Sequence, residues 1–235
     1  MTASTPLSPT ARSTPNRTKH RTVTERSALY DVLDVGLICH LGIVVDGAPV
    51  VLPTGYGRDG DTLYLHGSTG ARSLRTAASG VEVCATVTLL DGIVYARSLM
   101  HHSMNYRSVV VHGAARPVTE RVAKLHALEV ITEHLAPGSW RYAREVNARE
   151  FAAVAVLALD LSEASVKIRA GDPVDDQEDI DANAAWAGVL PLRQELGEPV
   201  AASDLAAAIP VPAHIAQRTG ATNAALGTSG GAVRP

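Results

Sequence analysis

Apolar and polar residues alternate through much of the middle of this chain, which is the pattern of half-buried β-strands. Residues 37–45 and 48–56 predict two strands, and Asp46-Gly47 between them is a strong signal for a hairpin turn. A second turn over residues 57–60 leads into a strand over residues 61–66. This part of the chain therefore predicts a run of short antiparallel strands.

The alternation returns after a short predicted helix that holds Arg72. Residues 81–89 alternate, and we expect Asp91-Gly92 to turn the chain into a strand over residues 93–98. Further strands are predicted over residues 106–117, 151–161 and 186–192. Such closely spaced strands joined by hairpins indicate a mainly β protein, built as an antiparallel barrel more than as a parallel sheet.

Few helices interrupt these strands. Thr22 and Glu25 have the spacing of a capping box, and Gly36 marks the end of the helix that follows them. A longer helix over residues 119–135 carries apolar residues at helical spacing. Several strands, residues 37–45 among them, are apolar on both faces, so one face would fill the barrel and a helix or a second subunit would cover the other.

The two ends of the chain differ in composition from its middle. Residues 1–21 are rich in Ser, Thr, Pro and Arg and predict a disordered tail, and residues 193–235 predict a mostly irregular one. Between them, residues 22–192 have the length of one ordinary domain.

Charge and cysteine content narrow the classes of function. The chain has a net charge of −3 and therefore lacks the excess of basic residues that is typical of a nucleic-acid-binding protein. Cys39 and Cys84 lie in apolar strand patterns and are interpreted as small buried hydrophobic residues, not as a disulfide or a metal site. The sequence shows neither an apolar run of membrane-spanning length nor a secretory signal, so we expect a cytoplasmic protein with no membrane partner.

Residues 60–72 (GDTLYLHGSTGAR) suggest the most specific chemistry. A strand runs into a turn and the start of a helix, with His66 at the end of the strand, Ser68 in the turn and Arg72 in the first helical turn. Backbone N–H groups at a helix start and a planar guanidinium both suit a phosphate. An ordinary capped helix with a solvated arginine is the alternative.

Residues 101–113 form a second polar cluster at the entry of a strand. Adjacent His101 and His102 suggest a metal, but neighbouring residues on an extended loop diverge, and no carboxylate or cysteine at ligand spacing joins them. We therefore predict no metal site. Arg107 and Ser108 are better placed to face a ligand, since barrels put ligand contacts at strand ends.

Four motifs together carry a family resemblance. They are residues 51–56 (VLPTGY), 63–68 (LYLHGS), 70–72 (GAR) and 106–110 (YRSVV). In this order they resemble the pyridoxamine 5′-phosphate oxidase-related flavoproteins, and within them the branch of the nitroimidazole-resistance proteins. The resemblance covers roughly residues 24–192.

The resemblance implies a split β-barrel homodimer that binds FMN in two clefts at the subunit interface. By resemblance, the FMN phosphate is held by His66, Ser68 and Arg72. Reasoning from the residues alone agrees on a phosphate but does not separate FMN from another phosphate ester.

Further cofactor contacts are implied by the same resemblance. Pro53, Thr54 and Tyr56 fall on the strand beside the isoalloxazine ring. Arg107 and Ser108 fall where the oxygens of the ring or of the ribityl chain are bound. Nearer the C-terminus, Lys167 and Arg169 would add positive charge near the flavin or pair with the acidic loop at residues 175–181. Trp186 would cover the flavin from the other subunit or pack in the dimer core.

The function expected is that of an FMN-binding oxidoreductase acting on an unknown small molecule. The vitamin B6 oxidase itself has an Arg and His pair near its C-terminus that holds the substrate phosphate, and this chain has none. Three alternatives stay open: a barrel that binds the deazaflavin F420, a non-catalytic flavin carrier, and a haem protein. The candidate haem ligands are His40, His101, His102 and His112.

Overall fold

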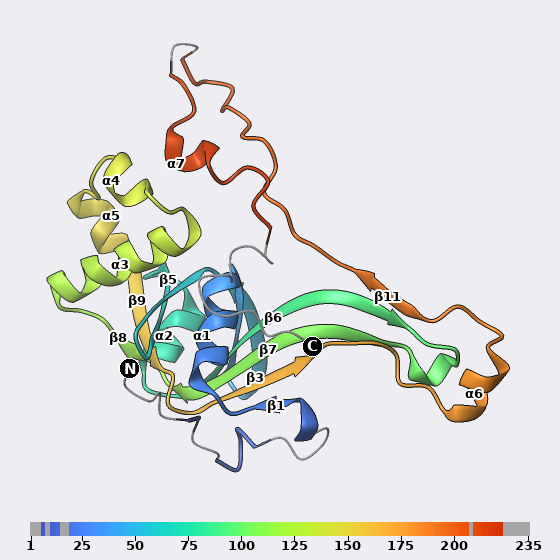
Figure 1. The fold of residues 1–235 in the computed structure, drawn as a ribbon. Coiled ribbons are helices and arrows are strands. Elements are labelled where there is room, and N and C mark those ends of the chain that lie inside the picture. The colour runs from blue at the N-terminus through green and yellow to red at the C-terminus, as the bar shows by residue number, and fades with distance from the viewer. Residues whose placement is uncertain (1–5, 8–9, 15–18, 207–208, 223–235) are drawn as a thin grey trace.

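The computed structural model describes residues 6–7, 10–14, 19–206 and 209–222 (Figure 1). The strands are β1 (Thr22–Val23), β2 (Cys39–Val45), β3 (Ala48–Thr54), β4 (Tyr56–Asp59), β5 (Thr62–Ser68), β6 (Glu82–Tyr95), β7 (Ser103–Ala114), β8 (Arg116–Pro117), β9 (Val154–Asp160), β10 (Ala164–Arg169) and β11 (Gly188–Pro191). The helices are η1 (Lys19–Arg21), α1 (Arg26–Val35), α2 (Arg72–Ala78), η2 (Leu99–His101), α3 (Arg121–Leu135), α4 (Ser139–Tyr142), α5 (Ala148–Ala153), α6 (Gln177–Ala182) and α7 (Ala213–Ala216).

Two sheets enclose one core. The larger sheet has the strand order β1-β10-β7-β6-β2-β3, with β11 paired to β6, and the smaller has the order β4-β5-β9-β8. All of these pairings are antiparallel. The prediction of a mainly β, antiparallel split barrel is confirmed.

The split arises where a strand leaves one sheet and enters the other. Residues 48–56, expected to form one strand, divide at Gly55 into β3 of the larger sheet and β4 of the smaller. Residues 106–117 divide in the same way into β7 and β8. The switch at Gly55 points Tyr56 into the core, where its side chain is fully buried.

The hairpin expected at Asp91-Gly92 is wrong. β6 runs straight through these residues, with a register shift against β7 between Leu90 and Gly92. Asp91 accepts two hydrogen bonds from the Arg107 guanidinium on β7, at 3.0 and 2.8 Å. Gly92 lies so close to β11 that a Cβ there would be 3.0 Å from the Leu190 carbonyl oxygen. The glycine therefore serves close strand packing and a bulge, not a reversal of the chain.

Beyond this bulge, the far ends of β6 and β7 project from the barrel together with η2, α6 and β11 (Figure 1). We call this projection, residues 91–105 and 172–192, the arm. It leaves large apolar side chains uncovered: Leu99 is 86%, Met100 89% and Trp186 70% exposed. Val94 on the arm is fully buried, so the exposed apolar side chains gather at the η2 turn and around Trp186 and do not extend over the whole arm.

Parts of both predicted tails lie against the domain. Leu7 is buried in the core, and Arg12 is ion-paired with Glu82 and Glu163. At the other end, the chain leaves the arm and runs back toward α7, which lies near α4 in Figure 1. Residues 1–5, 8–9, 15–18, 207–208 and 223–235 of the predicted tails lie outside the described residues. Within the described part of the chain, no helix has the length and apolar character needed to cross a membrane.

Candidate functional site

The two faces of the larger sheet have different chemistry. Residues on one face point into the core and are apolar and buried, as Leu41, Val87 and Val109 show. Their neighbours along the same strands point outward and are polar: His40 on β2, Thr88 on β6, Ser108 on β7 and Lys167 on β10. Thr88 is the cross-strand partner of Ser108, which is in turn the partner of Lys167. A polar row therefore crosses the outer face.

A pocket of about 550 Å³ opens at one side of this face. Its walls combine apolar groups from Leu37, Ile38 and Leu89 with His40 and Pro53, and residues of the C-terminal segment close it: Gln194, Glu195, Leu196 and Ala221. His40 and Pro53 are cross-strand partners. Among the described residues, the His40 imidazole has no hydrogen-bond or ion-pair partner, so both of its nitrogens are available to a ligand.

A smaller groove of about 210 Å³ lies on the other side of the face, lined by Ser108, His112 and Lys167. Arg12, from the N-terminal segment, forms one of its walls. The Arg12 guanidinium is bonded to Glu82 and Glu163, and this contact lowers the pKa of Glu163 to about 2. In the described part of the chain the Lys167 ammonium has no such partner, so it is the cation that this groove offers to a ligand.

The predicted phosphate cluster lies at the end of β5 and the start of α2. Ser68 accepts a hydrogen bond from the Gly70 amide at 3.1 Å, and Arg72 is the first residue of α2. The Arg72 side chain is 66% exposed and is ion-paired with Asp46 in the β2–β3 turn. An exposed pair of this kind contributes little stability, so a phosphate could replace the carboxylate at small cost.

His66 lies two residues before Ser68 on β5 and is half-buried. Burial lowers the pKa of its imidazole, and its Nδ1 atom is buried without a hydrogen-bond partner. An unpaired buried polar atom is costly and needs an explanation, such as a ligand or water at that position. Among the described residues, no hydrogen bond joins His66, Ser68 and Arg72 to one another.

The isoalloxazine strand expected from the sequence is the edge strand β3. It ends the larger sheet, so no strand in the described part of the chain pairs with its outer backbone groups. Pro53 is exposed there, and proline is tolerated at an edge because it has no N–H to donate. Thr54 points to the other side, opposite the buried Cys39, and its hydroxyl bonds to the Gly55 carbonyl at 3.2 Å.

Tyr56 has a packing role in the structure. Its hydroxyl lies 2.6 Å from the Leu33 carbonyl oxygen and 2.8 Å from that of Gly36, both at the end of α1. Burial strongly raises the pKa of this phenol, so it stays neutral. The side chain holds α1 on the barrel and does not reach a surface where a cofactor would bind.

Arg107 and Ser108 are separated by the strand itself. Successive side chains point to opposite faces, so Ser108 lies in the outer groove while Arg107 lies on the opposite face and pairs with Asp91. One ligand on the outer face can therefore contact Ser108 but not Arg107. Arg169 is also engaged, through hydrogen bonds to Asn105 and to the Gly171 and Asp172 carbonyls.

Trp186 lies on the arm, away from the pocket and the groove of its own chain. Its ring packs beside Tyr95, with ring centroids 6.0 Å apart, and over Gly188. Sequence reasoning missed Arg12, which was assigned to a tail, and the pocket wall formed by residues 194–196. Neither could be found from local patterns, since both depend on segments that return to the sheet from far along the chain.

Comparisons with known families and with solved structures identify proteins similar to this chain. The family model described as pyridoxamine 5′-phosphate oxidase matches residues 25–168. The solved structure of the flavocytochrome Anf3 from Azotobacter vinelandii is 35% identical with a TM-score of 0.86, covering 92% of this chain and 100% of its own. The FAD- and haem-binding protein from Mycobacterium smegmatis is 38% identical with a TM-score of 0.81, covering 85% of this chain and 98% of its own.

A 5-nitroimidazole antibiotic resistance protein from Bacteroides thetaiotaomicron shares the fold at 22% identity, with a TM-score of 0.52 over 63% of this chain and 86% of its own. No curated protein matches the chain. The family match spans more than half of the sequence and agrees with the split barrel described above. The chain belongs to the pyridoxamine 5′-phosphate oxidase family, whose fold binds flavin.

Proposed function

We propose that this chain binds a flavin nucleotide and haem and passes electrons between them as an oxidoreductase. The observation that carries the proposal is the match over at least 85% of the chain to two proteins described as a flavocytochrome and as FAD- and haem-binding. A bound flavin supplies one- and two-electron chemistry, and haem iron supplies one-electron chemistry. The residues of this chain would bind and orient the two groups.

The flavin is proposed to lie along the outer edge of β3. Arg72 and Ser68 would hold its phosphate, with the Arg72 fork exchanging Asp46 for phosphate oxygens. His66 supports this end of the site through its unpaired buried Nδ1 atom. The outer backbone groups of the edge strand near Pro53, with which no described strand pairs, would help to hold the flavin.

The haem is proposed to occupy the pocket beside His40. The pocket is large and mostly apolar, and His40, whose imidazole has no partner among the described residues, would hold the haem iron there. The other histidines suggested from the sequence fit less well. His101 is bonded to Ser98, Nδ1 of His102 accepts from the Ala96 amide, and His112 lies in the smaller groove. Pro53 borders both proposed sites, so the two groups would be neighbours.

The positions of the candidate residues support the proposal of a homodimer with a shared cleft. Lys167 on β10 and Pro53 on β3 are four strand spacings apart, roughly 19 Å. A flavin on the β3 edge would therefore meet Lys167 and Ser108 most readily if a second copy supplied them. The exposed side chains of the arm, Leu99, Met100 and Trp186, also suit an interface between copies.

The kind of flavin stays a prediction. FMN is expected from the sequence motifs, whereas the relative from Mycobacterium smegmatis is described as binding FAD. Chromatography of the flavin released from purified protein separates FMN, FAD and F420 directly. A flavin carrier without haem would give flavin absorption with no Soret band after haem is supplied.

The haem site is tested by titrating haem into the wild type and His40→Ala. We expect the wild type to give a sharp Soret band at one haem per chain and His40→Ala to lose it or shift it. His126→Ala is the matched control, because His126 is a surface histidine on α3 paired with Asp59. An unchanged spectrum in His40→Ala would exclude His40 as the ligand. Absence of haem binding by the wild type would contradict the flavocytochrome proposal.

A further inference from the structure

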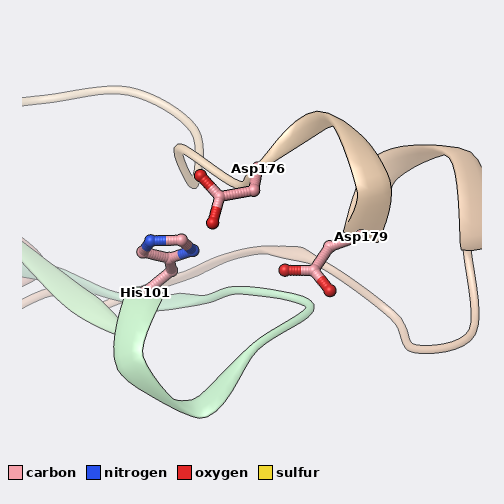
Figure 2. A group of neighbouring side chains, drawn as sticks. All are labelled: His101, Asp176 and Asp179. Carbon is pink, nitrogen blue, oxygen red and sulfur yellow. The ribbon is translucent and has the colours of Figure 1, made fainter.

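A group of metal-ligating side chains lies on the arm, apart from both proposed cofactor sites. His101 ends η2, while Asp176 and Asp179 lie at the start of α6 (Figure 2). One ligand atom from each of the three lies within 4.8 Å of the others. More than 70 residues of chain separate the histidine from the two aspartates, so no local sequence motif predicts this cluster.

The His101 ring has polar neighbours that fix its position. Its Nδ1 atom lies 3.0 Å from the Ser98 hydroxyl oxygen and 3.9 Å from an oxygen of the Asp175 carboxylate. Asp175 is itself fixed: its side chain is 1% exposed and accepts hydrogen bonds from the Arg97 backbone and guanidinium, at 3.0 and 2.9 Å. Polar partners of this kind restrict the rotation and the tautomer of an imidazole, so the ring is held beside the two aspartates.

The two aspartates lack the partners that such residues usually have. Asp176 precedes the first residue of α6, yet its side chain makes no capping hydrogen bond. Neither carboxylate has an ion-pair or side-chain hydrogen-bond partner in the described part of the chain. Two like charges this close to each other repel, and a cation between them removes the repulsion.

We propose that His101, Asp176 and Asp179 bind a divalent transition-metal ion, with water completing its coordination. One imidazole and two carboxylates make a mixed nitrogen and oxygen set, and the nitrogen favours Zn²⁺ or a similar ion over Ca²⁺ and Mg²⁺. The ion would join η2, in the β6–β7 connection, to α6. It would therefore stiffen the end of the arm, next to the exposed Leu99 and Met100.

The test is a calorimetric titration of the full chain with Zn²⁺ after dialysis against a chelator. We expect one Zn²⁺ per chain, at least tenfold weaker binding in Asp179→Asn and in His101→Ala, and weaker binding of Ca²⁺ than of Zn²⁺. Glu178→Gln is the matched control, because it removes the same charge from an exposed position on the same helix. Its affinity should stay within twofold of the wild type.

Hydrogen exchange gives a second readout that does not depend on the heat of binding. Zn²⁺ should slow exchange in residues 97–102 and 176–183 of the wild type and leave Asp179→Asn unchanged. The proposal would be overturned if the wild type showed no saturable binding of Zn²⁺. It would also be overturned if Glu178→Gln and Asp179→Asn lost the same amount of Zn²⁺ affinity. Equal affinity for Ca²⁺ and Zn²⁺, with no effect of His101→Ala, would overturn it as well.

Discussion

The inner and outer faces of the larger sheet are built from the same strands and do different work. Leu41 is buried while His40 beside it opens onto a pocket, and Val109 is buried while Ser108 beside it lines a groove. Strand alternation places every second side chain in the core and frees the others. Stability and ligand binding are therefore separated by a single step along the chain, and substitutions on the two faces should have separate effects.

The largest effect on folding should come from the inner face. Leu41→Ala removes a fully packed side chain and should lower the free energy of unfolding by about 2–5 kcal/mol, because it leaves a cavity as well as losing buried area. Denaturant unfolding measures this. The matched outer-face variant, His40→Ala, should change it by less than about 0.5 kcal/mol. Similar losses in the two variants would break the distinction between the faces.

Arg72→Ala should weaken flavin binding and leave the stability of the fold almost unchanged. Loss of a charge-assisted contact to phosphate should weaken FMN or FAD by about 1.5–3 kcal/mol, with a much smaller loss for riboflavin, which has no phosphate. Unfolding should hardly change, since the pair with Asp46 is exposed. Flavin fluorescence titrations measure the affinities, and Arg75→Ala on the same helix is the control. Equal losses for FMN and riboflavin would show that Arg72 does not contact the phosphate.

Tyr56→Phe decides between packing and cofactor binding for a residue that the sequence placed beside the flavin. The variant keeps the ring but leaves the Leu33 and Gly36 carbonyls without the phenol hydroxyl, which should cost about 1–2 kcal/mol of stability. Flavin affinity should not change. A variant of wild-type stability with weakened flavin would instead support the contact expected from the sequence.

A smaller effect is expected from pH. Burial lowers the pKa of the His134 imidazole, whose Nε2 lies 2.7 Å from the Gly36 carbonyl oxygen. The unfolded chain, with an ordinary value near 6.5, binds the proton more readily, so stability is fully present above that pH and falls as pH drops below it. His134→Gln should flatten this fall between about pH 6.5 and 5. His66 contributes in the same direction and is the residue to change next.

Local patterns were enough to predict much of the fold. The Asp46-Gly47 hairpin, the helix ending before Gly36 and the long α3 helix all formed, because short-range turn chemistry and apolar spacing determine them. Asp91-Gly92 was misread, since close packing against β11 and the pair between Asp91 and Arg107 override the turn signal. Such tertiary contacts join residues far apart in the sequence, so they cannot be predicted from a local pattern of a few residues.

The site was harder to predict than the fold. The family motifs gave Arg72, Ser68 and Pro53 as candidates, and alternation explains why Ser108 and Arg107 separate onto opposite faces. The pocket at His40 needs the C-terminal segment, and the cluster at His101 needs α6. Both depend on residues brought together from distant parts of the chain, which spacing along the sequence does not show.

The absorption spectrum of the protein saturated with flavin and haem tests the central claim most directly. After gel filtration removes free cofactor, the account predicts flavin bands and a Soret band in the same protein peak, each at one cofactor per chain. A peak that keeps flavin but no haem, at any haem concentration supplied, would contradict the claim that this chain holds both.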